Sequence, residues 1–271
     1  MSSLVSYARR VFTTTDLRTK IRLSLDACRL RGHEQLPIRI KDEPLDLPEF
    51  PLMPDKPNLV KPQLVPSMKN SNVSPSAYIL LNIAHIEMTA VHTYWDTIIR
   101  FSHRVQSPRS FIDDFLDILS DECKHFQMCQ RRLNQLGHSY GDIAAHSSLW
   151  DCVMATNEDL LARLAVVPMA QEARGLDAGP KFIQILEKQQ DMISAEIVSQ
   201  IVQDEVNHVS TGTKWYKEIC HANELDPITV FHSMIRRYMP QGFRPQFNAR
   251  DRQLAGLTPE YYEPLVTINR V

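Results

Sequence analysis

Glycine is scarce in this sequence, and the short motifs that depend on it are missing. Only eight of the 271 residues are glycine, and they form no GxGxxG, P-loop or GxSxG motif. The sequence therefore indicates neither a phosphate-binding loop nor the nucleophile turn of serine hydrolases. An HExxH motif is also missing, which argues against a zinc protease.

Cysteines, apolar runs and net charge indicate the compartment and the kinds of partner that fit this protein. The five cysteines are scattered and form no CxxC pair, a pattern that fits a reducing compartment better than a disulfide framework. No run of about 18 apolar residues predicts a membrane span. The net charge of −2 gives no support for binding to nucleic acid or to an anionic membrane. We therefore expect a cytoplasmic protein that does not span a membrane, and a homodimer stays open.

The first 32 residues are basic and allow two interpretations. They contain seven arginines and lysines against two aspartates, with several serines and threonines. This composition is typical of a mitochondrial transit peptide. The same residues also fit a surface helix over about 16–31, which we favour, so a mitochondrial location stays open.

Residues 37–75 hold nine of the 17 prolines. Proline removes a backbone donor and disfavours helix in the residue before it, so this stretch should be extended. It also carries many apolar side chains, among them Phe50, Leu52, Leu59 and Leu64. These predict a strap that packs across a helical body.

The pattern becomes helical from Ser74, a suitable N-cap that is followed by Pro75 at the first helical position. Apolar periodicity and caps predict helices over 75–103, 109–136, 148–174, 181–190, 191–222 and 227–238.

The four longest of these helices predict an all-α fold, an antiparallel four-helix bundle. We expect one domain over 1–271. In it, 1–74 form an N-terminal helix and the Pro-rich strap, 75–222 the bundle, and 223–271 a C-terminal helix and tail.

Two copies of the pattern Asp-Glu-x-x-His stand out, at 121–125 and 204–208. Residues three apart share one face of a helix, so each Glu–His pair can bind one ion. A third Glu-x-x-His, Glu218 with His221, lies about 220° round the helix from Glu205 and is expected at the surface.

The acids of the two motifs lie among apolar neighbours. Glu122 and Glu205 each fall on the apolar stripe of their helix, and Glu87 does the same on the helix over 75–103. A buried carboxylate without a cation costs several kcal/mol. The pattern therefore predicts that cations compensate these acids.

The helix over 148–174 offers two acids for a fourth carboxylate. Glu158 and Glu172 share one face but lie about 21 Å apart, so both cannot serve one site. We favour Glu172, beside the bend expected at Pro168.

Two single carboxylates and two Glu-x-x-His pairs form the ligand set of di-iron and di-manganese bundles. Iron or manganese suits this mixture of imidazole and carboxylate, and zinc stays open. Asp121 and Asp204 are candidates to accept a hydrogen bond from the ligand histidines. The predicted metal ligands are Glu87, Glu122, His125, Glu172, Glu205 and His208.

The same segments resemble a ferritin-like family that is catalogued as a domain of unknown function. The resemblance extends from the Val11-Phe12 start to the late Phe247-Asn248-Ala249-Arg250, and includes Glu172-Ala173-Arg174-Gly175-Leu176-Asp177. More distantly, the chain is similar to the ferritin-like tRNA hydroxylase that oxidises a prenylated adenosine, which implies a fold and a metal site but no substrate. Lys124 and Asn207, inside the two Glu-x-x-His motifs, stand where many di-iron proteins of this type carry an arginine in one motif.

Three functions fit this pattern. The first is an O₂-activating oxidoreductase or hydroxylase with two metal ions, Fe/Fe or Mn/Fe, and an organic substrate. The second is a ferroxidase or iron-storage protein, which the strap and tail fit poorly. The third is a helical binding protein with an inactive site. We favour the first, by analogy with the ferritin-like class.

Overall fold

The computed structural model describes residues 3–31, 36–39 and 47–267, and among these it is helical, without a strand. Two isolated bridges, Leu59 with Ala145 and Phe243 with Val266, are the β pairing found in these ranges. The chain divides into two compact units, residues 1–150 and 151–271. Within the described residues, no helix is long and apolar enough to cross a membrane. The all-α prediction is confirmed.

The first unit begins with two short helices, α1 (Leu4–Thr13) and α2 (Leu17–Leu30). Ser3 and Ser6 form a reciprocal capping box that starts α1, and Asp16 caps α2 by accepting from the Thr19 N–H. Only the second of these helices was predicted.

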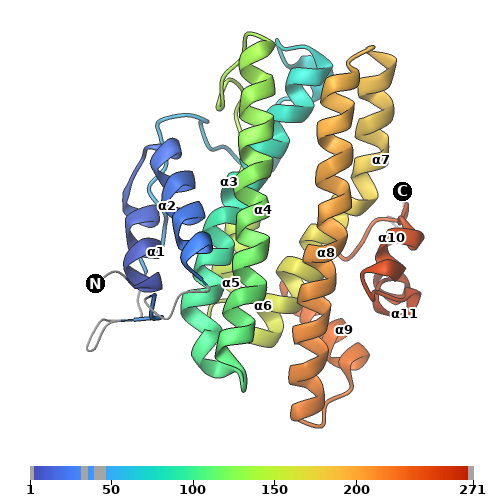
Figure 1. Ribbon diagram of the computed structural model, residues 1–271. Coiled ribbons are helices and arrows are strands. Elements are labelled where there is room, and N and C mark those ends of the chain that lie inside the picture. The colour runs from blue at the N-terminus through green and yellow to red at the C-terminus, as the bar shows by residue number, and fades with distance from the viewer. Residues whose placement is uncertain (1–2, 32–35, 40–46, 268–271) are drawn as a thin grey trace. The chain divides into compact units, whose positions relative to one another are not determined.

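Two long helices, α3 (Pro75–Phe101) and α4 (Pro108–Gln135), pack against each other in the first unit (Figure 1). Ser74 accepts from the Ala77 N–H and Pro75 occupies the first position, as predicted. Gly137, with φ of +78°, ends α4, because it takes the left-handed conformation that glycine adopts without strain.

The described part of the Pro-rich strap is held by its backbone. Leu52 donates its N–H to the Phe12 carbonyl at 2.7 Å, and Val60 donates to the Ala145 carbonyl at 2.9 Å. The prediction that its apolar side chains are buried is wrong for four of them, which are exposed: Phe50, Leu52, Leu59 and Leu64. Residues 32–35 and 40–46 lie outside the described ranges.

The second unit contains the remaining helices. The boundary falls in α5 (Ser148–Ala155), and α6 (Leu160–Val166) follows. After a π-helical turn, η4 (Val167–Gln171), come α7 (Glu172–Lys188), α8 (Met192–Ala222), α9 (Pro227–Tyr238), α10 (Ala249–Leu254) and α11 (Pro259–Tyr262). Helices α8 and α9 match their predicted ranges closely.

The predicted continuous helix over 148–174 is wrong. Asp159 caps a new helix, α6, by accepting from the Ala162 N–H, so the chain turns after α5. The predicted end at Gly175 is also wrong, because α7 continues through Pro180. At the π turn, the Glu172 N–H bonds to the Val167 carbonyl, five residues earlier, which accommodates Pro168 without ending the helical path.

Glycine allows α8 to approach the π turn. A Cβ on Gly212 would lie 2.4 Å from Cβ of Pro168, a rigid ring atom. We therefore expect Gly212→Ala to lower the free energy of unfolding by about 1–3 kcal/mol through overpacking, measured by urea denaturation. Gly175→Ala is the matched control, because its Cβ would meet its nearest atom, Cγ of Glu205, at 4.0 Å. Equal effects of the two substitutions would contradict the close packing at Pro168.

The C-terminal segment is attached to α7 through an ion pair between a buried arginine and a partly exposed aspartate. Arg252 donates from Nε and Nη2 to the two carboxylate oxygens of Asp177, at 2.9 and 2.6 Å. Its guanidinium also lies over the rings of Phe247 and Tyr262, 4.8 and 4.7 Å from their centroids. The predicted C-terminal tail contains two short helices, α10 and α11. Residues 268–271 of that tail lie outside the described ranges.

Candidate metal centre

Three predicted ligands meet in the first unit, and we call them the first half-site: Glu87, Glu122 and His125. Glu87 lies on α3, and the other two lie on α4 one turn apart. Their exposed fractions are 3, 0 and 1%. Each therefore faces the interior, as the apolar stripes predicted for the two glutamates.

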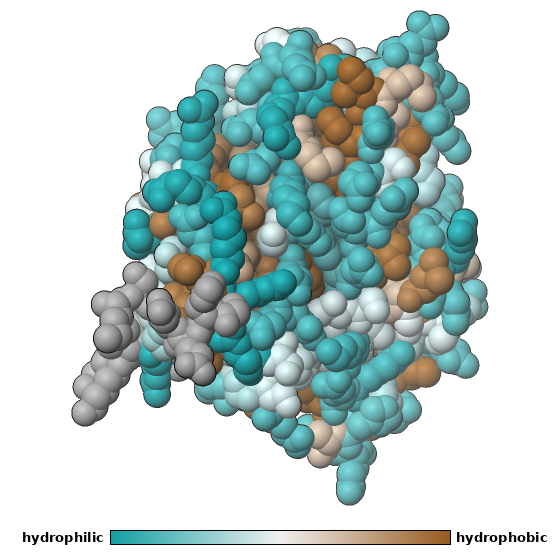
Figure 2. All heavy atoms as spheres, in the orientation of Figure 1, coloured by the Kyte–Doolittle hydropathy of each residue, from teal (hydrophilic) through white to brown (hydrophobic). Residues whose placement is uncertain are grey.

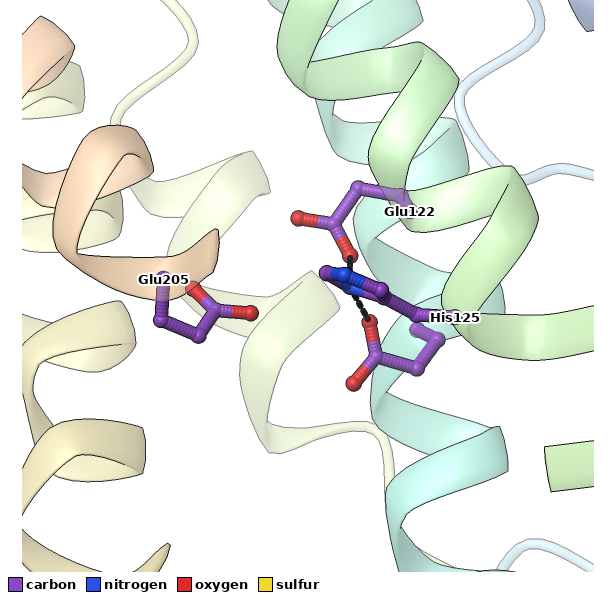
Figure 3. A group of neighbouring side chains, drawn as sticks. Glu122, His125 and Glu205 are labelled. Carbon is purple, nitrogen blue, oxygen red and sulfur yellow. Dashed lines mark ion pairs between the residues drawn. The ribbon is translucent and has the colours of Figure 1, made fainter. Parts of the chain in front are cut away.

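The first half-site has the geometry of a cation-binding group. Nδ1 of His125 lies 3.4 Å from Oε2 of Glu87 and 3.9 Å from Oε2 of Glu122. One ligand atom from each of the three residues lies within 4.8 Å of the others. Figure 3 shows Glu122 and His125 turned toward each other from successive turns of α4. This buried group could hold a metal ion.

Burial and the contacts among the three side chains shift the pKa values of Glu87 and His125. Burial, and next the negative charge of Glu122, raise the pKa of Glu87 well above its usual value. Burial alone lowers the pKa of His125, but its contacts with Glu122 and Glu87 outweigh this and raise the pKa to about 11. The half-site therefore favours bound protons, and a divalent cation would neutralise the same carboxylates while displacing those protons.

The other three predicted ligands lie in the second unit, and we call them the second half-site: Glu172, Glu205 and His208. On α8, Nδ1 of His208 lies 3.2 Å from Oε2 of Glu205, and Figure 3 shows Glu205 projecting from that helix. Glu172 is the first residue of α7, which packs along α8. All three side chains are buried.

The structure distinguishes the two candidate acids of the predicted helix over 148–174. Glu172 is 7% exposed, whereas Glu158 is exposed in the turn between α5 and α6. A solvated acid gains little from a cation, while a buried one needs compensation. Burial therefore favours Glu172.

The donor set fits a divalent ion of the iron, manganese or zinc type. Each half-site offers two carboxylates and one imidazole, the ligand types that such ions prefer. All six side chains are buried, and in the first half-site, where Glu87 and Glu122 lie in one group, an uncompensated pair of carboxylates would cost several kcal/mol. The residues present therefore fit a metal.

The two aspartates and the third Glu-x-x-His motif that the sequence singled out lie outside the two half-sites as defined above. Asp121 accepts from Lys124 at 2.7 Å and Asp204 accepts from Gln200 at 3.0 Å. Their predicted role toward the histidines stays a prediction. The third motif, Glu218 and His221, is exposed, as expected.

Cys129, which shares the apolar stripe of Glu122, lies in the surroundings of the first half-site. Cys129 is fully buried, and burial followed by the charge of Glu87 raises the pKa of its thiol well above the usual value. It lies seven residues after Glu122, on the same face of α4. The stripe itself was therefore the signal that placed it beside the acids.

Comparison with known proteins identifies the family. The model of the family described as "Protein of unknown function (DUF455)" matches residues 13–263, so the chain belongs to this family. An uncharacterized protein from Haemophilus influenzae is 33% identical over 227 residues, covering 82% of this chain and 79% of that protein. No solved structure gives a significant match. The family identified from the sequence is thus confirmed.

Proposed function

We propose that the two half-sites come together in a ferritin-like four-helix bundle within a single domain and hold two divalent metal ions, iron foremost. We propose further that the loaded protein is an oxidoreductase that activates O₂ and oxidises a small organic substrate. Asp121 and Asp204 would orient the ligand histidines in that site.

The proposal is supported by the identical design of the two half-sites. Each lies on a pair of packed helices, α3 with α4 and α7 with α8. Each pair carries one single glutamate and one Glu-x-x-His motif, and all six side chains are buried. Two such pairs supply the ligands of a di-metal carboxylate bundle, in which four glutamates balance the charge of two M²⁺ ions.

The buried charge is the observation that carries the proposal. Glu87 and Glu122 lie in one group with His125 in the interior of the first unit. Without a cation, burial and the charge of Glu122 both act against the ionised form of Glu87. A helical core has no structural need for such a group, whereas a metal site requires it.

Within the proposed site, the chain's own residues would fix the ions, exclude water and balance the charge. When bound, iron would supply the reactivity toward O₂ that side chains lack. The apolar residues around the carboxylates would keep the surroundings dry, which strengthens each electrostatic contact.

The test is metal content followed by reactivity. Protein purified without chelator should contain about two metal ions per chain by elemental analysis, as the ligand set requires. After anaerobic loading with Fe²⁺, stopped-flow measurement should show O₂ consumption much faster than that of free ferrous ion. Purified protein free of iron, manganese and zinc would contradict the metal site. Bound iron that reacts with O₂ no faster than free iron would contradict the oxidoreductase activity but not the metal site.

A further inference from the structure

A groove between α2 and α4 lies within the first unit and uses none of the proposed metal ligands. Its volume is about 450 Å³, within the range of about 300–1,000 Å³ that is usual for small-molecule sites. Six lining residues come from one face of α2 and three from α4. The basic N-terminal segment noted in the sequence therefore forms one wall of a defined concave surface.

The two helices run in opposite directions along this groove. Near the end of α2, the Cys28 thiol donates to the Leu116 carbonyl at 3.3 Å. The start of α2 correspondingly lies opposite the later part of α4, where Gln127 and Arg131 line the groove. Arg18 and Arg131 thus face the same end of it from different helices.

Positive charge is concentrated on the groove. Four arginines line it and no acid does: Arg18, Arg22, Arg29 and Arg131. Asp26 lies 3.7 and 3.5 Å from the guanidiniums of Arg22 and Arg29 and partly neutralises them. Arg18 and Arg131 form no ion pair with any residue that the structure describes. Two guanidiniums are therefore available to an anion at one end.

The floor between the arginines is aliphatic. Leu17, Ile21 and Leu25 follow one another every four residues along α2 and line the groove. Figure 2 shows apolar residues among hydrophilic ones over α2 and α4. A ligand that fills this groove must therefore combine an anionic group with an apolar body.

We propose that the groove binds a small amphiphilic anion from solution. Its carboxylate or phosphate head would lie between Arg18 and Arg131, where planar guanidiniums can each donate two hydrogen bonds. Its apolar body would lie along Ile21 and Leu25. The recessed position of Ile21, only 3% exposed, favours a ligand over a membrane surface. The absence of aromatic side chains from the lining disfavours stacked nucleotide bases.

Calorimetric titration of the full-length protein tests this, with decanoate, decyl phosphate, decanol, inorganic phosphate and anionic phospholipid vesicles as probes. The amphiphiles are used below their micelle concentrations. One or both amphiphilic anions should bind with one site per chain, and decanol and phosphate at least about tenfold more weakly. The double variant Arg18→Gln/Arg131→Gln should weaken anion binding by about tenfold or more, the value of one charge-assisted hydrogen bond. Its metal content should equal that of the wild type.

The matched control is Arg109→Gln, an exposed arginine of α4 that does not line the groove and pairs with Asp113 at 3.1 Å. It should bind the anions as the wild type does. Three results would overturn the proposal: no binding of either amphiphilic anion, equal binding by the double variant, or binding only to anionic phospholipid vesicles. The relative affinity for the two anions identifies the head group.

Discussion

Replacing Glu122 by Gln should abolish metal binding while leaving the fold intact. Glu122 is fully buried beside Nδ1 of His125 and raises the pKa of Glu87. Loss of groups that only orient ligands weakens metal binding about 10–100-fold, so loss of a ligand should exceed this. The amide oxygen of Gln can still accept from His125, so removal of the negative charge beside Glu87 should chiefly relieve repulsion and raise the melting temperature of the metal-free protein.

Weaker metal binding together with a higher melting temperature of the metal-free protein would show that the variant has lost a ligand. A damaged fold would lower both metal binding and the melting temperature. Wild-type protein with Fe²⁺ or Mn²⁺ at 100 times its dissociation constant should gain about 2.7 kcal/mol of stability, and the variant should gain almost nothing. Thermal denaturation with and without metal, together with elemental analysis, gives both values. Glu218→Gln, the exposed acid of the third motif on α8, is the control and should behave as the wild type. A variant that retains two ions would remove Glu122 from the site.

Replacing Arg252 by Ala should destabilise the second unit more than any other single charge removal described here. Arg252 is 1% exposed, pairs with Asp177 through two hydrogen bonds, and reaches the Ala173 carbonyl at 3.5 Å. Removal of one partner from a buried pair costs about 3–5 kcal/mol. With a shift of about 2–4 °C per kcal/mol, the melting temperature should fall by roughly 6–20 °C.

A double-mutant cycle with Asp177→Ala tests the origin of that loss. If the ion pair holds the C-terminal segment to α7, the two single substitutions should couple by about 0.5–3 kcal/mol, because they remove the same contact. Arg250→Ala, an exposed arginine of the same short helix, should change stability by no more than about 0.5 kcal/mol. Additive effects of Arg252 and Asp177 would mean that each residue acts through other neighbours.

Local signals predicted the helices that carry the first half-site and part of the second. Ser74, Pro75 and Gly137 mark boundaries through backbone chemistry that acts within a few residues, and α3, α4 and α8 follow the predicted ranges. The burial of the four glutamates follows from apolar stripes with a period of 3.6 residues, and the two histidines follow from their spacing of three residues after Glu122 and Glu205. Such patterns need no knowledge of distant contacts.

Features that depend on distant residues were not predictable in this way. The pairing of Arg252 with Asp177 spans 75 positions in the sequence, and nothing near either residue indicates the other. The break in the predicted helix over 148–174 depends on Asp159 as a cap, and its extension past Gly175 on packing against α8. The strap likewise exposes leucines whose apolarity predicted burial, because backbone hydrogen bonds fix its path.

The π-helical turn at Val167–Gln171 has a consequence for the direction in which Glu172 points. A π turn holds one more residue than an α turn, and each residue of an α-helix adds 100° of rotation. The direction of the Glu172 side chain relative to α6 therefore depends on the number of residues in the turn before it. An inserted or deleted residue in this turn would rotate Glu172, together with the rest of α7, by about 100° relative to α6.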